Sequence, residues 1–362
     1  MVKSENKRNY GIDLLRIISM FMVVILHVLG SGGILDATLG MVMHNRATWL
    51  LEIAAYCAVN CYALISGYVG VNNKFKFTNI VTLWLQVFFY NLLISVLFWL
   101  FKFQPFNFDT IVNAIFPVFT RRYWYFTAYF CMFFFTPALN LILNKMSKKQ
   151  MGFILLSGVI ILSVFPTFLQ LDTFGLTYGY SPWWLIFLYL IGGYIKKYNL
   201  FSNGGWKEYI VYYICFVLFT FLSKIGFEFI TIRLFGEIRY NFMFIGYTSP
   251  TILGCAISLL MAFSKMKVQK ISKFISFFAP LSFGVYIIHN NPIFAQKFWH
   301  GKFVFLSEYS PFLIILGVFA CTLVVYIGCS LVDFVRFSIF KFFKIKERVS
   351  KLEKKYLNGV FN

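Results

Sequence analysis

Long apolar stretches follow one another along almost the whole chain, and short polar segments separate them. An α-helix needs roughly 17 to 25 mostly apolar residues to cross a bilayer. The pattern therefore predicts an all-α, polytopic integral membrane protein with about ten transmembrane helices. The predicted spans cover residues 11–31, 49–71, 78–101, 123–143, 151–171, 183–198, 208–229, 241–263, 275–296 and 311–335.

Composition and charge placement support this class and argue against nucleic-acid binding. The chain is 60% hydrophobic with a mean hydropathy of +0.74, far more apolar than a soluble globular protein. Its formal charge is +20, yet with both termini in the cytoplasm 23 of its 33 lysines and arginines fall in inner segments, eight in outer segments and two within spans. Small clusters on one side of a membrane do not make the continuous basic surface that a nucleic acid requires.

The predicted spans divide the chain into three parts. Residues 1–10 are expected to form a cytoplasmic N-terminal segment, residues 11–335 a ten-helix membrane domain, and residues 336–362 a cytoplasmic tail. Because ionisable residues interrupt the first apolar stretch, we expect it to be a retained span rather than a cleaved signal peptide. The tail alternates Phe, Ile and Leu with Lys and Arg, which favours a basic amphipathic helix on anionic inner-leaflet lipids over a partner-binding segment.

Three ionisable residues, Asp13, Arg16 and His27, interrupt the first predicted span. Such groups are costly at membrane depth, so each is expected to be paired or functional. Arg16 and His27 are eleven residues apart, which places them within about 20° in azimuth and about 16 Å apart along a helix axis. They therefore share one face at two depths, with Arg16 near the cytoplasmic surface and Asp13 one turn before it.

This arrangement has a functional and a structural interpretation. A cation at the inner mouth and a proton-handling group deeper in the helix suit an elongated, phosphate-bearing donor whose reactive end reaches into the bundle along one passage. Alternatively, Arg16 snorkels to the interface and His27 hydrogen-bonds a neighbouring helix. The shared face favours the functional interpretation.

Several stretches resemble the family-three membrane acyltransferases. NYGIDLLRIISMFMVVILHV (9–28) is similar to the first span of that family, whose signature is an arginine, ten residues and a histidine, as in Arg16 and His27. The stretches VNCYALISGYVGV (59–71), YWYFTAYFCMFFFTPALN (123–140), SPWWLIFLYLIGGYIKKY (181–198) and LSFGVYIIHNNPIF (281–294) resemble its second, fourth, sixth and penultimate spans. The resemblance extends over residues 9–335, and its nearest likeness is to surface-polysaccharide O-acetyltransferases.

The resemblance implies a multi-pass enzyme of a bacterial plasma membrane. It would move an acyl group, usually acetyl, from cytoplasmic acetyl-CoA to a hydroxyl of a surface glycan or its lipid-linked precursor. Arg16, oriented by Asp13, would hold CoA phosphates, and His27 would act as general base or transient acyl carrier. No extracytoplasmic hydrolase-like domain is expected in these residues, so the membrane domain would complete the transfer or hand the group to a separate partner.

Further polar residues in or beside the spans are candidates for the same site. His289, as a second catalytic residue, and Tyr286 one turn before it, as an acceptor-binding residue, are expected to face the cavity of His27. The asparagines and proline after His289 predict that the helix loosens there. The other candidates are Ser66 and Tyr68 for CoA, and Glu52, Arg122 and Trp124 for the acceptor. The structural alternatives are a helix-bridging hydrogen bond for His289, helix packing for Ser66 and Tyr68, a solvated carboxylate for Glu52, and interfacial anchoring for Arg122 and Trp124.

Other classes of function remain open at this point. Buried polar groups also line transport paths, so a transporter or flippase for a lipid-linked glycan is the main alternative, and a structural or sensory protein is another. No metal is expected, because the seven cysteines lie within spans and no histidine or carboxylate pattern completes a site. Unchanged glycan acetylation with blocked export would favour transport.

Overall fold

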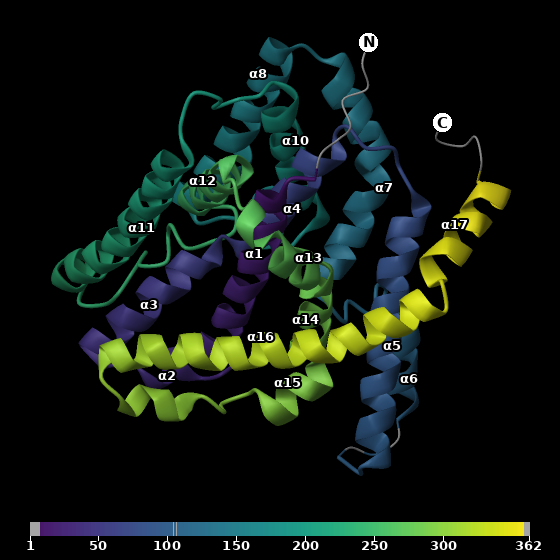
Figure 1. The fold of residues 1–362 in the computed structure, drawn as a ribbon. Coiled ribbons are helices and arrows are strands. Elements are labelled where there is room, and N and C mark those ends of the chain that lie inside the picture. Colours follow the sequence, from purple (N-terminus) through teal and green to yellow (C-terminus); the bar gives the residue numbers. More distant parts are fainter. Residues whose placement is uncertain (1–7, 104, 106, 358–362) are drawn as a thin grey trace.

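The computed structural model describes residues 8–103, 105 and 107–357, and this part of the chain is helical, without β-strands (Figure 1). The first helices are α1 (Tyr10–Leu29), α2 (Ile34–Ala37), α3 (Val42–Tyr56), α4 (Ala58–Gly70), α5 (Phe77–Leu100), α6 (Phe108–Ile115), α7 (Trp124–Lys145), α8 (Lys148–Val159) and α9 (Phe165–Leu169). They continue with α10 (Pro182–Lys197), α11 (Trp206–Phe235), α12 (Pro250–Lys265), α13 (Ser272–Phe278), α14 (Ser282–His289), α15 (Pro292–Phe298), α16 (Pro311–Phe342) and α17 (Ile345–Tyr356). A π-helical turn, Ile160–Val164, joins α8 to α9, and short 3-10 turns cover Thr177–Gly179, Gln269–Ile271, Ala279–Leu281 and Val304–Glu308.

The structure confirms the all-α membrane class. Among the described residues, eight helical stretches are long and apolar enough to cross a bilayer. The other two predicted spans correspond to α10 and α12, which have 16 residues each. Residues 241–249 precede α12 rather than belonging to it, because Ser249 caps the helix and Pro250 occupies its first position, where proline is favoured. The count of ten spans and the cytoplasmic termini stay predictions.

Helix α1 lies at the centre of the bundle (Figure 1). It begins where the Asn9 side chain accepts hydrogen bonds from the backbone N–H groups of Gly11 and Ile12. It packs against α3, α4, α12, α14 and α16. The helix that carries Arg16 and His27 is therefore enclosed by protein over most of its length, and lipid does not surround it.

Two glycines allow α4 and α10 to cross with their backbones in contact. A Cβ added to Gly67 would lie 1.9 Å from the Tyr189 carbonyl oxygen, and one added to Gly192 would lie 2.1 Å from the Leu64 carbonyl oxygen. Only glycine fits such an approach. Gly67, in the middle of the Ser-Gly-Tyr stretch, therefore serves helix packing.

A buried polar network joins α5, α14 and α16. The Asp333 carboxylate pairs with the Arg336 guanidinium at 2.7 Å and accepts hydrogen bonds from Gln86 Nε2 at 3.1 Å and the Tyr90 hydroxyl at 2.8 Å. It packs so closely on Gly284 that an added Cβ would lie 2.0 Å from its Cγ. Because Gly284 lies in α14, the network fixes the helix that ends at His289.

The C-terminal residues form helices that differ in extent from the predicted tail. Helix α16 runs without a break through residue 335 to Phe342, and α17 then turns back toward the start of α5 (Figure 1). Glu353 of α17 accepts hydrogen bonds from the Phe77 and Thr78 backbone N–H groups at 2.7 and 3.0 Å, and from the Thr78 hydroxyl. The carboxylate thus caps α5 from a distant part of the chain. Most of the predicted N-terminal segment, 1–10, lies outside the described residues.

The Glu353 cap predicts pH-dependent docking of α17. Burial alone would raise the pKa of Glu353, but the hydrogen bonds from Thr78 and Phe77 outweigh burial and hold the pKa below its ordinary value. A carboxyl group with a lowered folded-state pKa contributes stability above its unfolded pKa, and this stability is lost as pH falls through the folded pKa. We expect Glu353→Ala at neutral pH, and acid in the wild type, to accelerate hydrogen exchange in α17. Glu347→Ala is the control, since Glu347 is exposed on the same helix; equal acceleration in both variants would contradict the cap.

Candidate active site

The end of α14 places His289 in the interior. The helix ends at His289, as Pro292 predicts, and Asn291 caps α15 by accepting from the Ile293 and Phe294 backbone N–H groups. The Asn291 side chain also donates to Asn91 Oδ1 at 3.1 Å and to the Tyr123 hydroxyl at 3.0 Å. Tyr123 in turn donates to the Ile287 carbonyl oxygen. These bonds tie the break after His289 to α5 and to the start of α7.

The two histidines of the predicted site are in direct contact. His27 Nδ1 lies 2.8 Å from His289 Nε2, and the two rings come from helices 262 positions apart in the sequence. His289 is fully buried, whereas His27 is half-buried. The structure therefore brings His27 and His289 together as a hydrogen-bonded pair. His289 itself does not line the cavity that His27 faces, which differs from the expectation that both histidines face it.

The hydrogen bonds determine which nitrogen of His27 is free to accept a proton. His289 Nδ1 lies 2.6 Å from the Val285 carbonyl oxygen, which only accepts, so His289 carries its proton on Nδ1. In the neutral His289 ring Nε2 is then an acceptor, and it accepts a hydrogen bond from the Nδ1–H of His27. This leaves His27 Nε2 with a lone pair. A neutral histidine pair oriented in this way presents one base, and its position is fixed by the second ring.

His27 lines a cavity of about 230 Å³ inside the bundle. Three of the four predicted acceptor residues, Glu52, Trp124 and Tyr286, line the same cavity. Within the described part of the chain, Glu52 Oε2 and the Tyr125 hydroxyl are buried without a hydrogen-bond partner, and both residues line this cavity. Buried polar atoms without hydrogen-bond partners are rare, so we expect a polar ligand to supply the missing partners.

Aromatic side chains form one wall of the His27 cavity. The rings of Trp124 and Tyr180 have centroids 4.4 Å apart. The Tyr247 ring stacks on Trp124 with centroids 6.0 Å apart and is tilted against Tyr180 at 5.0 Å. Asn60 fixes this wall, because its side chain donates to the Tyr247 carbonyl oxygen at 2.8 Å and accepts from Trp184 Nε1. Aromatic rings and hydrogen-bonding groups around one cavity suit a ligand with both apolar and polar parts.

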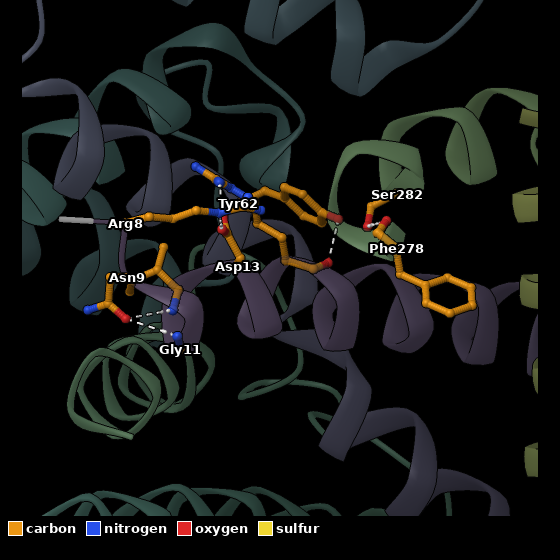
Figure 2. A network of polar contacts seen from close by, with 9 residues as sticks. Arg8, Asn9, Gly11, Asp13, Tyr62, Phe278 and Ser282 are labelled. Carbon is orange, nitrogen blue, oxygen red and sulfur yellow. Dashed lines mark hydrogen bonds and ion pairs between the residues drawn. The ribbon is translucent and has the colours of Figure 1, made fainter. Parts of the chain in front are cut away.

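Arg16 lines a second cavity, of about 370 Å³, at the N-terminal end of α1. The Asp13 carboxylate lies between two guanidinium groups, 2.6 Å from Arg8 Nε and 2.6 Å from Arg16 Nη1 (Figure 2). Tyr68 and Lys196 line the same cavity, and the Lys196 ammonium lies 5.0 Å from the Tyr68 ring centroid. The cavity therefore offers three cations against one carboxylate, which favours an anionic ligand.

The single passage predicted between Arg16 and His27 is not observed, because these residues line two cavities that share no residue. Tyr62 lies between them. Its ring lines the His27 cavity, and its hydroxyl donates to the Arg16 carbonyl oxygen at 2.6 Å (Figure 2). Spacing along a helix fixes azimuth and depth, but the side chains of other helices determine whether the space between two positions is open.

Three predicted site residues do not line either cavity: His289, which contacts His27, and Ser66 and Arg122. The Ser66 hydroxyl donates to the Tyr62 carbonyl oxygen at 2.8 Å, one turn earlier in its own helix. Arg122 precedes α7, and its buried Nε has no hydrogen-bond partner within the described residues. Neither Ser66 nor Arg122 borders the space beside His27 or Arg16. The predicted roles of these two residues in binding stay untested predictions.

Sequence reasoning missed several residues that line the two cavities. Arg8 and Lys196 contribute positive charge to the Arg16 cavity. In the sequence they are only two of the many basic residues in the predicted cytoplasmic segments, so nothing singles them out. Tyr56, Tyr180 and Tyr247 line the His27 cavity from segments far apart in the chain. No local pattern brings these tyrosines together.

Comparison with known proteins gives one match. The family described as an acyltransferase domain, acyltransferase family 3, matches residues 9–331. This range includes every residue of both cavities except Arg8. No curated protein and no solved structure gives a significant match.

Proposed function

Because the chain belongs to acyltransferase family 3, we propose that it moves an acetyl group from acetyl-CoA to a hydroxyl of a surface glycan or its lipid-linked precursor. The proposal places the enzyme in a bacterial plasma membrane with the Arg16 cavity at the cytoplasmic side. The observation that carries it is the histidine pair, which presents a free Nε2 lone pair beside a cavity of aromatic and unpartnered polar groups.

The proposed chemistry is a direct attack of the acceptor hydroxyl on the thioester. His27 Nε2 takes the hydroxyl proton while the oxygen forms a bond to the thioester carbonyl carbon. The carbon–sulfur bond then breaks, the CoA sulfur leaves as thiolate, and the proton on His27 passes to it. The products are an acetyl ester and free CoA, and the neutral histidine pair is restored. The Tyr125 hydroxyl lines the same cavity and has no hydrogen-bond partner within the described residues, so in this proposal it donates a hydrogen bond to the carbonyl oxygen as negative charge develops there.

The acceptor side of the proposal uses the His27 cavity. Glu52 Oε2 accepts a hydrogen bond from a neighbouring sugar hydroxyl, and the aromatic wall of Trp124, Tyr180 and Tyr247 stacks on an apolar face of a sugar ring. On the donor side, Arg8, Arg16 and Lys196 hold CoA phosphates. Tyr62 must move away from the Arg16 carbonyl before the thioester reaches His27.

Surface-glycan acetylation tests the function as a whole. Cells that express the wild-type chain are compared with cells that lack it, and ester-linked acetate on the isolated surface glycans is measured by NMR. We expect acetate only where the chain is present, with unchanged polymer length and export. Unchanged acetate together with loss of exported polymer would replace the proposal with glycan transport.

Arg16 is expected to contribute to donor affinity. Hydrogen bonds between charged groups are worth about 1.5–3 kcal/mol, so Arg16→Ala should weaken acetyl-CoA binding on the order of tenfold to a hundredfold. The measurement is calorimetric titration of the purified protein in lipid nanodiscs. Arg46→Ala is the matched control, because Arg46 is an exposed arginine near the start of α3. Equal affinity of the wild type and Arg16→Ala would show that the donor binds elsewhere.

A further inference from the structure

A third cavity, distinct from the two already described, lies between the start of α5, the end of α16 and α17. Its volume is about 1110 Å³, several times that of the His27 cavity. Glu353 holds α17 against α5 and so maintains the cavity. We call it the α17 cavity. It shares no lining residue with either cavity of the proposed active site.

The α17 cavity is strongly cationic. Seven lysines and Arg336 line it, against the carboxylates of Glu347 and Glu353. Glu353 is engaged by the backbone of α5, and Arg336 is already paired with Asp333. Within the described residues no ion pair involves the lysines, which are Lys74, Lys76, Lys341, Lys344, Lys346, Lys351 and Lys354. Cations in clear excess over carboxylates around one cavity attract a polyanionic or phosphate-bearing ligand.

The same cavity has apolar surface that a small soluble anion would leave unused. Phe77, Phe337 and Phe340 line it beside the lysines. Helix α17 has apolar residues on one face, and two of them, Leu352 and Tyr356, are 56% and 69% exposed. No residue of α17 is buried. The uncovered apolar face and the lysines together match the interface of a membrane, where phosphates and acyl chains meet.

The position of the α17 cavity also agrees with a membrane interface. Helices α5 and α16 are both long and apolar enough to span a bilayer, and the cavity lies where α5 begins and α16 ends. It is therefore located at one membrane surface. We propose that the α17 cavity binds an anionic phospholipid, with the phosphate among the lysines and the acyl chains against the phenylalanines of α5 and α16.

Lipid binding to the purified full-length chain tests this proposal. The protein in dodecyl maltoside is titrated with phosphatidylglycerol, with phosphatidylcholine and with inorganic phosphate, and bound lipid is counted by native mass spectrometry. We expect retained phosphatidylglycerol and little phosphatidylcholine. Replacing Lys341, Lys344 and Lys351 with glutamine should weaken phosphatidylglycerol binding on the order of tenfold to a hundredfold, because each lysine near an anionic lipid contributes separately.

The matched control replaces Lys145, Lys148 and Lys149 with glutamine, because these three exposed lysines lie outside the cavity. Equal loss in both triple variants would overturn the site, and displacement of the lipid by millimolar phosphate would point to a soluble anion instead.

Photoreactive phosphatidylglycerol on the wild-type protein gives a readout that needs no variant. We expect adducts on α17 and the start of α5, and adducts spread evenly over all helices would contradict the proposal. Neither readout depends on acyl transfer.

Discussion

Replacing His27 with alanine is expected to lower the rate of acetyl transfer by about 10²- to 10⁴-fold, the usual contribution of a positioned general base. The variant removes the Nε2 lone pair that the hydrogen-bonded pair presents to the cavity. It keeps the Arg16 cavity intact, so acetyl-CoA affinity should change little. The measurement is transfer of labelled acetyl from acetyl-CoA to membrane glycan by the protein in nanodiscs.

His300→Ala is the matched control for His27→Ala, because His300 is an exposed histidine outside both cavities. It should retain full activity. Size-exclusion profiles in detergent check that His27→Ala still folds, since loss of His27 leaves His289 Nε2 without its donor. A folded His27→Ala protein with wild-type turnover would remove His27 from the chemistry.

The largest effect on stability is expected for Asp333→Ala. Removing one partner of a buried ion pair leaves the other charge buried and unpaired, which costs about 3–5 kcal/mol. Arg336 is 5% exposed, and within the described residues no other carboxylate forms an ion pair with it. Gln86 and Tyr90 lose their hydrogen-bond acceptor at the same time. Thermal unfolding of the purified protein in detergent should therefore shift to a clearly lower temperature.

The exposed pair of Glu237 and Arg239 provides the control for Asp333. Their side chains are largely exposed, so Glu237→Ala should cost only about 0–1 kcal/mol. Gly284→Ala should reproduce the Asp333 effect without changing any charge, because the new Cβ occupies the space of the carboxyl group. Equal unfolding temperatures for Asp333→Ala and Glu237→Ala would show that the buried network does not hold α14 to α16.

Much of the fold follows from hydrophobic pattern, and some of the site does too. The length of the apolar stretches predicts the helices because a helix needs about 20 apolar residues to cross a bilayer. Pro292 marks the end of α14 because proline disrupts a helix interior. The azimuth of Arg16 and His27 on α1 follows from helix geometry alone. The contact between His27 and His289 fits their similar depth, although the sequence does not determine the hydrogen bond itself.

Tertiary packing decides what the sequence leaves open. Tyr62 interrupts the expected passage because α4 crosses α1 at that level, and no periodicity in either helix reports such a crossing. Helix α16 passes residue 335 without a break because its buried pair, Asp333 and Arg336, continues the packing beyond the last apolar stretch. The cap that Glu353 places on α5 joins residues 275 positions apart, so it has no local signature.

A double-mutant cycle on the histidine pair tests the central claim most directly. Acetyl transfer is measured for the wild type, His27→Ala, His289→Phe and the double variant under the same conditions. If His289 acts only by orienting His27, the double variant is no slower than His27→Ala, because the two residues work as one unit. Losses that multiply in the double variant would show that the two histidines act independently, and would contradict the assignment of His27 Nε2 as the base held in place by His289.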